Sequence, residues 1–401
     1  MASTSVSIIG AGPAGLMAAE RLSAAGLGVH VHERMPSPAR KLLMAGRGGL
    51  NLTHSEPFER FLTRYGPQAG RLAPALSAFT PDDLRAWAEG LGEPTFVGSS
   101  GRVFPESFKA SPLLRAWLRR LAGQGVNLNT RHQWLGWDGA GRLRFATPEG
   151  ELLEQPAATL LALGGASWPR LGADGGWVGL LRAQGVEVRD FVPANMGVRC
   201  AWSDLFRSRF AGTPLKRIVV RCGEARAAGE AVVTEAGLEG GAIYAVSRAV
   251  REALAADGAT LHVDLRPDLD VARLAGRLSA APSRLSFANL LRKAAGLSPV
   301  AAGLLREAIG PARPADAGAL AEAIKAVPLT VTGVGDLSRA ISSAGGLAWD
   351  EVGADFQLRR LPGVFVAGEM LDWEAPTGGY LLQACFATGR AAAEGILARL
   401  S

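Results

Sequence analysis

The stretch Val6-Ser7-Ile8-Ile9-Gly10-Ala11-Gly12-Pro13-Ala14-Gly15 decides the fold of this 401-residue chain. It begins with a short, mostly apolar run that is long enough for one buried strand, and this run leads directly into Gly-x-Gly-x-x-Gly. The Ala/Leu-rich residues 16–22 follow at helical spacing. A strand, a glycine turn and a helix in this order predict the first half of a dinucleotide-binding βαβ unit.

Each glycine of this motif has a physical role. Gly10 allows a tight turn off the strand, Gly12 lets the backbone approach a pyrophosphate, and Gly15 lets helix and strand pack closely. The helix N-terminus supplies free N–H groups and a positive partial charge. A second predicted strand, residues 29–32, ends at Glu33, where an acidic residue can accept from a ribose hydroxyl. An ordinary strand-to-helix turn is the alternative, because a chain with 51 glycines contains glycine motifs by chance.

The composition indicates a globular protein with several domains. Hydrophobic residues make up 48% and charged residues 20% of the chain. The net charge of +6 raises the question of nucleic acid, but the arginines are scattered and no run of Lys and Arg reaches five. A solvated basic surface that attracts anionic cofactors is therefore the favoured interpretation, and nucleic acid is the less favoured partner.

Cysteine and histidine give no metal or redox motif. Cys200, Cys222 and Cys385 form no Cys-x-x-Cys pair, and the five histidines lack metal-ligand spacing, so we expect neither a metal nor a disulfide framework. We expect Cys385 to pack in a helix rather than to act in redox chemistry. No stretch approaches the ~20 apolar residues of a membrane span and no signal peptide is evident, so we expect a cytoplasmic protein without a membrane partner.

The following segments supply further strands and loops. Residues 126–130, 133–137 and 143–146 resemble short strands, and turns such as residues 138–141 favour antiparallel pairing among them. Residues 157–163 form a continuous apolar run, which predicts a parallel strand buried on both faces. It ends at Gly164-Gly165, where open α/β sheets bind ligands.

From about residue 193 the pattern changes to strands followed by helices, and we interpret residues 193–332 as an inserted unit. Its charge-rich helices favour a solvated lid over nucleic-acid contacts. The run Val331-Thr332-Gly333-Val334-Gly335-Asp336-Leu337 resembles a second nucleotide motif, but Ser338 replaces the third glycine and no βαβ unit follows. We therefore predict no separate NAD(P)H domain.

Two glycine-rich segments are candidates for contact with a flat ring. Residues 46–53 can bring backbone amides against a ring or phosphate, and a mobile surface loop is the equal alternative. Near the C-terminus, residues 361–369 predict a strand that ends in Gly-Glu. Thr377-Gly378-Gly379-Tyr380 then opens a long apolar helix, residues 381–400. A flavin fits this arrangement, because a helix N-terminus stabilises the negative charge that its pyrimidine ring gains on reduction.

With these residues placed, the chain resembles the HI0933-like (YhiN/BaiN-type) flavoproteins, which share the glutathione-reductase-type FAD fold. The likeness extends over nearly the whole chain. Its most specific matches are Lys41-Leu42-Leu43, Asn51-Leu52-Thr53, Ala344-Gly345-Gly346, and Gly368-Glu369-Met370-Leu371-Asp372 with Thr377-Gly378-Gly379-Tyr380. The family usually has Gly-Arg-Cys-Asn where this chain has Gly48-Gly49-Leu50-Asn51, so no role for that arginine or thiol is carried over.

The resemblance implies an α/β fold in which a Rossmann-like FAD/NAD(P)-binding domain is formed from both chain ends, residues 1–192 and 333–401. Residues 193–332 would be an inserted domain with a β-barrel-like and a helical part. The pyrophosphate would lie at the opening glycines, the adenosine ribose at Glu33, and the isoalloxazine at Gly378–Tyr380. The residues expected at the cofactor are Gly10, Gly12, Pro13, Ala14, Gly15, Glu33, Arg34, Lys41, Asn51, Gly164, Gly165, Gly368, Glu369, Gly378, Gly379 and Tyr380.

Three functions are compatible with these features. The first is an FAD-dependent oxidoreductase that transfers hydride through flavin N5 to or from a small organic substrate, with NAD(P)H as a transient donor. Tyr380 and Glu369 are its candidate proton donors. The second is a flavin-containing RNA-binding or RNA-modifying protein, and the third is a flavin redox sensor without turnover. The sequence gives neither the substrate nor the oligomeric state.

Overall fold

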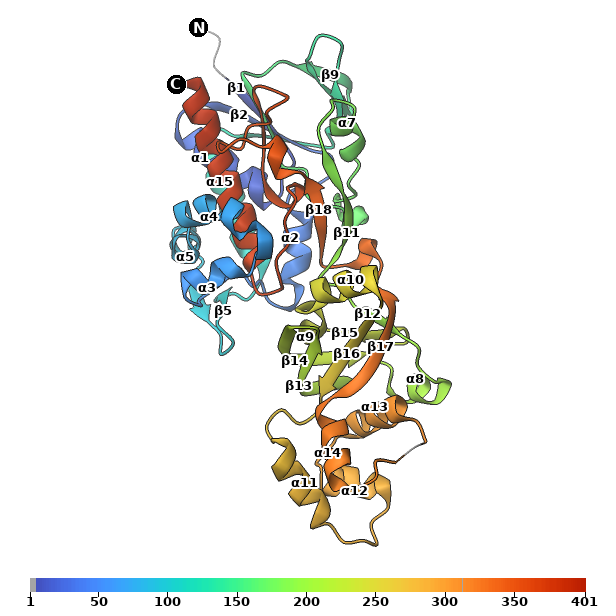
Figure 1. Ribbon diagram of the computed structural model, residues 1–401. Helices are drawn as coiled ribbons and strands as arrows, with labels where there is room; N and C mark the ends of the chain where they lie inside the picture. The colour runs from blue at the N-terminus through green and yellow to red at the C-terminus, as the bar shows by residue number, and fades with distance from the viewer. Residues whose placement is uncertain (1–4, 312) are drawn as a thin grey trace. The chain divides into compact units, whose positions relative to one another are not determined.

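The computed structural model describes residues 5–311 and 313–401 (Figure 1). The chain divides into two compact units, one made of the chain up to Val192 with Ser342–Ser401, the other of Pro193–Ile341. The C-terminal end of the inserted unit lies later in the chain than the expected boundary at 332/333. The reason is that strand β17 (Val327–Val334) continues past residue 332 and pairs with its barrel neighbour through Val334. Among the described residues, no helix is both long and apolar enough to cross a membrane.

A five-stranded parallel sheet forms the centre of the first unit, in the order β19–β10–β1–β2–β6. Its strands are β1 (Ser5–Ile9), β2 (Gly28–Glu33), β6 (Asn127–Thr130), β10 (Ala158–Leu161) and β19 (Val364–Val366). Every residue of β10 is buried, as expected of a parallel strand covered on both faces. The predicted antiparallel pairing of residues 126–130 is wrong: β6 instead extends the parallel sheet beside β2, with Leu128 opposite Val31.

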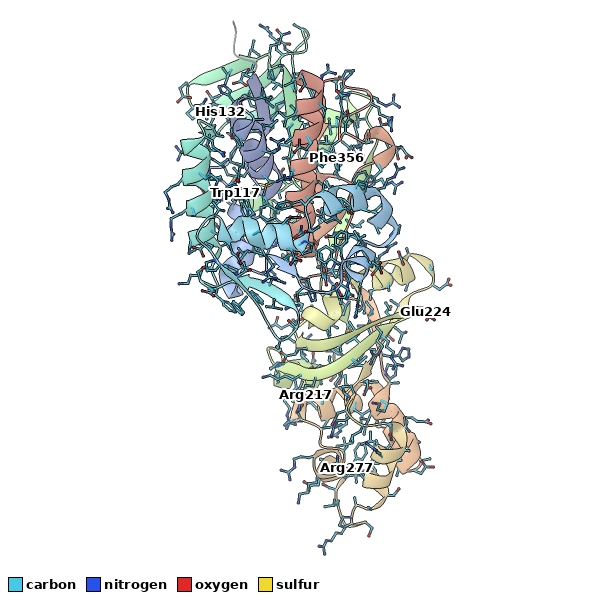
Figure 2. All side chains as sticks on the ribbon, turned by 90° about the vertical axis from the view of Figure 1, so that its left-hand side faces the viewer. Trp117, His132, Arg217, Glu224, Arg277 and Phe356 are labelled. Carbon is cyan, nitrogen blue, oxygen red and sulfur yellow. The ribbon has the colours of Figure 1, made fainter. Side chains whose placement is uncertain are left out.

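Helices from both chain ends cover this sheet together. α1 (Pro13–Ala24) and α15 (Tyr380–Leu400) lie side by side, shown in blue and red in Figure 1. The backbones of the two helices pack so closely that a Cβ placed on Gly389 would lie 2.2 Å from the carbonyl oxygen of Ala14. α6 (Ala110–Gly123) adds Trp117, labelled in Figure 2, which is fully buried in the same core.

The rest of the first unit consists of short elements around this core. Two antiparallel three-stranded sheets have the orders β3–β5–β4 and β7–β8–β9. Their strands are β3 (Thr53–His54), β4 (Thr95–Val97), β5 (Arg102–Pro105), β7 (Gln133–Trp137), β8 (Leu143–Thr147) and β9 (Gly150–Glu154). The remaining helices are α2 (Arg40–Ala45), α3 (Phe58–Thr63), α4 (Ala69–Ala78), α5 (Pro81–Glu89) and α7 (Val178–Arg182), and β11 (Val188–Ala194) and β18 (Ser342–Leu347) are further strands.

The second unit is built on a closed six-stranded barrel in the order β12–β15–β14–β13–β16–β17. Its strands besides β17 are β12 (Val198–Cys200), β13 (Pro214–Cys222), β14 (Ala225–Val233), β15 (Gly237–Glu239) and β16 (Ala259–Asp264). Its helices are α8 (Asp204–Phe210), α9 (Gly241–Tyr244), α10 (Ser247–Ala256), α11 (Val271–Ser279), α12 (Phe287–Lys293), α13 (Pro299–Ile309) and α14 (Ala317–Lys325). The glycine run after Val331 belongs to barrel strand β17 and the residues after it. The predicted fold class, a Rossmann-like domain from both chain ends with a barrel-like and helical insertion, is confirmed.

Gly389 provides a test of the helix contact that joins the two chain ends. Gly389→Ala should lower the free energy of unfolding by about 1–3 kcal/mol, because the new methyl group meets the Ala14 carbonyl and one helix must move. Gly70→Ala is the matched control: it adds a methyl group to helix α4 where no atom lies within 4 Å, and stability should stay within about 1 kcal/mol. Urea denaturation of both variants measures the difference, and equal stabilities would contradict the packing.

Candidate functional site

A pocket of about 390 Å³ opens in the first unit, where β1, β10 and β19 end. This edge of a parallel sheet is where α/β folds bind ligands. Of the residues expected at the cofactor, those that line it are Gly10, Gly12, Pro13, Ala14, Glu33, Arg34, Lys41, Gly164, Gly368 and Glu369. The structure thus brings residues from both chain ends to one cavity.

The three opening glycines serve different purposes. Gly10 has φ +107°, and a Cβ there would lie 2.3 Å from the carbonyl oxygen of Ala162. A Cβ on Gly15 would lie 2.0 Å from the carbonyl oxygen of Gly10. A Cβ on Gly12 would meet no atom within 4 Å. Gly10 and Gly15 are therefore required by the packing of the fold, whereas Gly12 borders the open space of the pocket.

Helix α1 presents an uncapped N-terminus to this space. Its N-cap is Gly12, Pro13 stands in the first turn, no side chain caps the helix, and no acidic residue lies in the first turn. The first N–H groups of a helix have no intrahelical partner. They are free to donate to an anion, and the positive end of the helix dipole favours such a ligand.

Glu33 lies beside this helix end with its carboxylate held by the backbone. Oε2 accepts from the N–H of Ala11 at 3.0 Å, and Oε1 accepts from the N–H of Met35 at 2.9 Å. Burial raises the pKa of Glu33, and the two backbone hydrogen bonds act against that rise. Each carboxylate oxygen accepts more than one hydrogen bond, so the fixed carboxylate can still receive ribose hydroxyls.

Lys41 and Glu369 form an ion pair in the lining of the pocket. Lys41 Nζ donates to both carboxylate oxygens of Glu369, at 3.0 and 2.7 Å, and to Ser167 Oγ at 2.7 Å. Ser343 N–H also donates to Glu369 at 3.1 Å. The pair is mostly shielded from solvent, with Glu369 only 7% exposed. Arg34 instead faces Asp174, to which it donates at 2.8 Å.

Some of the expected residues do not line the pocket: Gly15, Asn51, Gly165, Gly378, Gly379 and Tyr380. Gly165 packs against Ser343, whose Oγ would lie 1.9 Å from a Cβ. Gly379 packs on the backbone of Thr53, because a Cβ placed on Gly379 would lie 2.5 Å from the Cα of Thr53. The start of α15 therefore lies directly against β3. These two glycines are explained by close packing.

Tyr380 belongs to a buried polar and aromatic cluster around β3. Its hydroxyl donates to Glu56 Oε1 at 2.5 Å, and its ring stacks on His54 with centroids 5.4 Å apart. Burial raises the pKa of Tyr380, and the hydrogen bond to Glu56 raises it further. Burial alone would raise the pKa of Glu56, but hydrogen bonds from Arg64 and Tyr380 bring it below its ordinary value. The phenol therefore keeps its proton beside an ionised carboxylate.

Several pocket residues escape sequence reasoning because no local pattern marks them. His32 and His132 both line the cavity, and their Nδ1 atoms lie 3.2 Å apart. His32 Nε2 lies 3.1 Å from Glu154, which also accepts from Ser7 Oγ at 2.8 Å. Figure 2 labels His132, whose pKa is lowered by burial and by His32. In the sequence, the only indication that a histidine lines this pocket was the position of His32 immediately before Glu33.

Trp134, Trp177 and Cys385 also line the pocket, although the sequence did not place them at the cofactor. Trp177 Nε1 donates to the carbonyl of Gly164 at 3.0 Å, which fixes the loop after β10. Cys385 is buried, and burial raises the pKa of its thiol to about 12. Such a thiol stays protonated and behaves as an apolar packing group. Among the described residues, no group of three His, Cys, Asp or Glu could hold a metal ion.

FAD fits these residues on two structural grounds. The open space at Gly12, the uncapped helix and the fixed Glu33 match a pyrophosphate joined to a ribose. Buried polar atoms without a partner among the described residues include Trp134 Nε1 and Arg40 Nε, and both residues line the pocket. Buried polar atoms are normally hydrogen-bonded, so a polar ligand accounts for such atoms.

The fold and the pocket define a Rossmann-type dinucleotide-binding protein of the FAD-dependent oxidoreductase class. The sequence model described as "HI0933-like protein Rossmann domain" matches residues 4–395. The chain belongs to the HI0933-like family, which confirms the resemblance found in the sequence.

Known relatives agree with this assignment. A 3-dehydro-bile acid delta(4,6)-reductase of Clostridium scindens is 26% identical over 415 residues, covering 97% of this chain and 99% of the relative. Among solved structures, a flavocytochrome c3 fumarate reductase has a TM-score of 0.51 at 16% identity, covering 98% of this chain and 78% of the other. A 3-ketosteroid delta1-dehydrogenase of Sterolibacterium denitrificans has a TM-score of 0.51 at 13% identity, covering 99% and 100%. At these identities the two structures show the shared fold alone.

Gly12 offers a test that separates cofactor binding from folding. Gly12→Val should weaken FAD binding by about 100-fold, or about 2.8 kcal/mol, because the side chain fills space beside the helix N-terminus. The apoprotein should keep its melting temperature, since the extended backbone at Gly12 (φ −82°, ψ −177°) suits valine and no protein atom is displaced. Fluorescence titration with FAD and thermal unfolding measure the two effects.

Gly10→Val is the matched comparison. Its φ of +107° and its contact with Ala162 predict loss of stability in the apoprotein itself. Unchanged FAD affinity in Gly12→Val would contradict the assignment of this pocket.

Proposed function

We propose that the protein transfers hydride between flavin N5 and a carbon of an unsaturated small organic substrate, with NAD(P)H as the donor. The observation that carries this proposal is the uncapped, glycine-opened start of helix α1 beside the backbone-held carboxylate of Glu33, both facing one pocket. The end-to-end similarity to the delta(4,6)-reductase supports the direction of reduction. When bound, a flavin supplies hydride transfer at its ring, and the protein supplies position and electrostatics.

The residues of this chain would divide the work of holding the cofactor. The N–H groups of α1 would donate to the pyrophosphate, and Glu33 would accept from the adenosine ribose. The Lys41–Glu369 pair would place a positive ammonium and a compensating carboxylate in the middle of the pocket. Because both oxygens of Glu369 already accept from Lys41, Glu369 acts as its positioning partner rather than as a proton donor.

Tyr380 is the other candidate proton donor, and its hydroxyl lies in the cluster around β3, outside the lining of the pocket. Its hydroxyl carries a proton at neutral pH, since burial raises its pKa. Glu56, held by Arg64 at 2.6 and 2.8 Å, fixes the orientation of that hydroxyl. Tyr380 would protonate a substrate carbon only if the substrate extends from the pocket to the cluster around β3, because a general acid must lie within hydrogen-bond reach of that carbon.

Anaerobic reduction tests the proposal. The visible flavin absorbance of the purified protein should bleach within seconds of adding NADPH or NADH, and an unsaturated alicyclic ketone or acid should restore it with formation of the saturated product. Product analysis by mass spectrometry distinguishes substrate reduction from reoxidation by oxygen. Flavin that neither nucleotide reduces would contradict NAD(P)H as donor, and reduced flavin that no such substrate reoxidises would favour a redox sensor.

A further inference from the structure

A second pocket, of about 540 Å³, lies within the inserted unit and is separate from the candidate cofactor site. Three segments line it: the start of β13, the chain after β16 with Arg277 of α11, and the turn before α13. Arg217 and Arg277 are labelled in Figure 2. Its volume falls within the ~300–1,000 Å³ of typical small-ligand sites.

The lining is strongly cationic. It contains Lys216, Arg217, Arg266 and Arg277 against a single acid, Asp268. Arg266 engages Asp268 through two hydrogen bonds of 3.0 and 2.9 Å, and this contact lowers the pKa of Asp268 to about 2. Arg217 also attracts Asp268 electrostatically, so the lining holds four cationic side chains against one carboxylate and keeps an excess of positive charge.

Lys216, Arg217 and Arg277 are exposed and form no ion pair with a carboxylate in the part of the chain that the structure describes. Arg217 also has an unusual backbone. Its φ is +52°, and it lies where the pairing of β13 with β14 shifts register between Leu215 and Ile218. A non-glycine residue in the left-handed region is strained, and β-bulges often reorient a side chain next to a functional site. The strain at Arg217 therefore points to a role for its side chain.

Apolar side chains also line the pocket. Leu215, Ile218, Leu265, Leu297 and Ala301 all line it and are at most 6% exposed. A lining of cationic and apolar side chains suits an anion with an organic body. Arginine forms paired hydrogen bonds with phosphate oxygens, and lysine adds a point charge.

We propose that this pocket binds a small organic phosphate of about mononucleotide size, with Lys216, Arg217 and Arg277 holding the phosphate groups. An RNA is the less suitable occupant, because the three cations surround one cavity instead of forming an extended track for a nucleic-acid backbone. The proposal does not depend on the flavin chemistry, since all of its residues lie in the inserted unit.

Calorimetric titration of the FAD-saturated protein with pyrophosphate and with ADP, at physiological salt, tests the proposal. We expect one saturable site per chain and tighter binding of ADP. The double variant Arg217→Asn/Arg277→Gln should bind pyrophosphate at least about tenfold more weakly. Asparagine is chosen at 217 because it tolerates the left-handed backbone. Arg226→Gln, an exposed residue of β14 outside the lining, is the control and should bind as the wild type does.

Four results would overturn the proposal. The first is absence of saturable binding by either probe, and the second is equal binding by the double variant. The third is tRNA binding with a steep salt dependence that pyrophosphate does not displace, which would assign these cations to a nucleic acid. Gly12→Val should retain pyrophosphate binding; its loss would place the anion in the FAD pocket and would equally overturn the proposal.

Discussion

Ala14, near the N-terminus, is in close contact with two glycines of the C-terminal part of the chain, and the pocket depends on these contacts. A Cβ on Gly389 would lie 2.2 Å from its carbonyl oxygen, and a Cβ on Gly368 would lie 2.9 Å from its methyl carbon. Glycine at both positions lets helix α15 and the end of β19 approach the first turn of α1. Any larger residue would separate these elements and widen the cavity between them.

The same contact explains why the walls of the pocket come from distant parts of the sequence. Gly368 has φ +84°, its N–H donates to Thr388 Oγ1 at 3.0 Å, and its carbonyl accepts from Trp373 Nε1 at 3.0 Å. The turn after β19 is thereby fixed, and Glu369 is directed toward Lys41. In the pocket, Lys41 and Arg34 are paired with carboxylates, whereas the positive end of helix α1 remains available.

The fold could be predicted from the sequence because its signals are local. The strand, the three glycines and the helix at residues 5–24 form one continuous pattern, and the helix at residues 380–400 follows its own glycine opening. The predicted fold class and family are confirmed. Residues 126–130 were assigned to the wrong sheet, because a short strand does not show in its sequence whether its partner is parallel or antiparallel.

The side-chain network of the site could not be predicted in the same way. His32, His132 and Glu154 meet only in the folded chain, and Tyr380 pairs with Glu56 over 324 positions. Motif matching identified Lys41 and Glu369 separately but not their ion pair. Pairings of this kind depend on tertiary distances, which no spacing in the sequence records.

The visible absorption spectrum of the purified protein, before and after incubation with FAD and removal of the unbound cofactor, tests the central claim most directly. The account predicts the two visible bands of an oxidised flavin and one FAD per chain. A protein that shows no flavin absorbance after this treatment, while folded by circular dichroism, would contradict the assignment of the pocket to FAD.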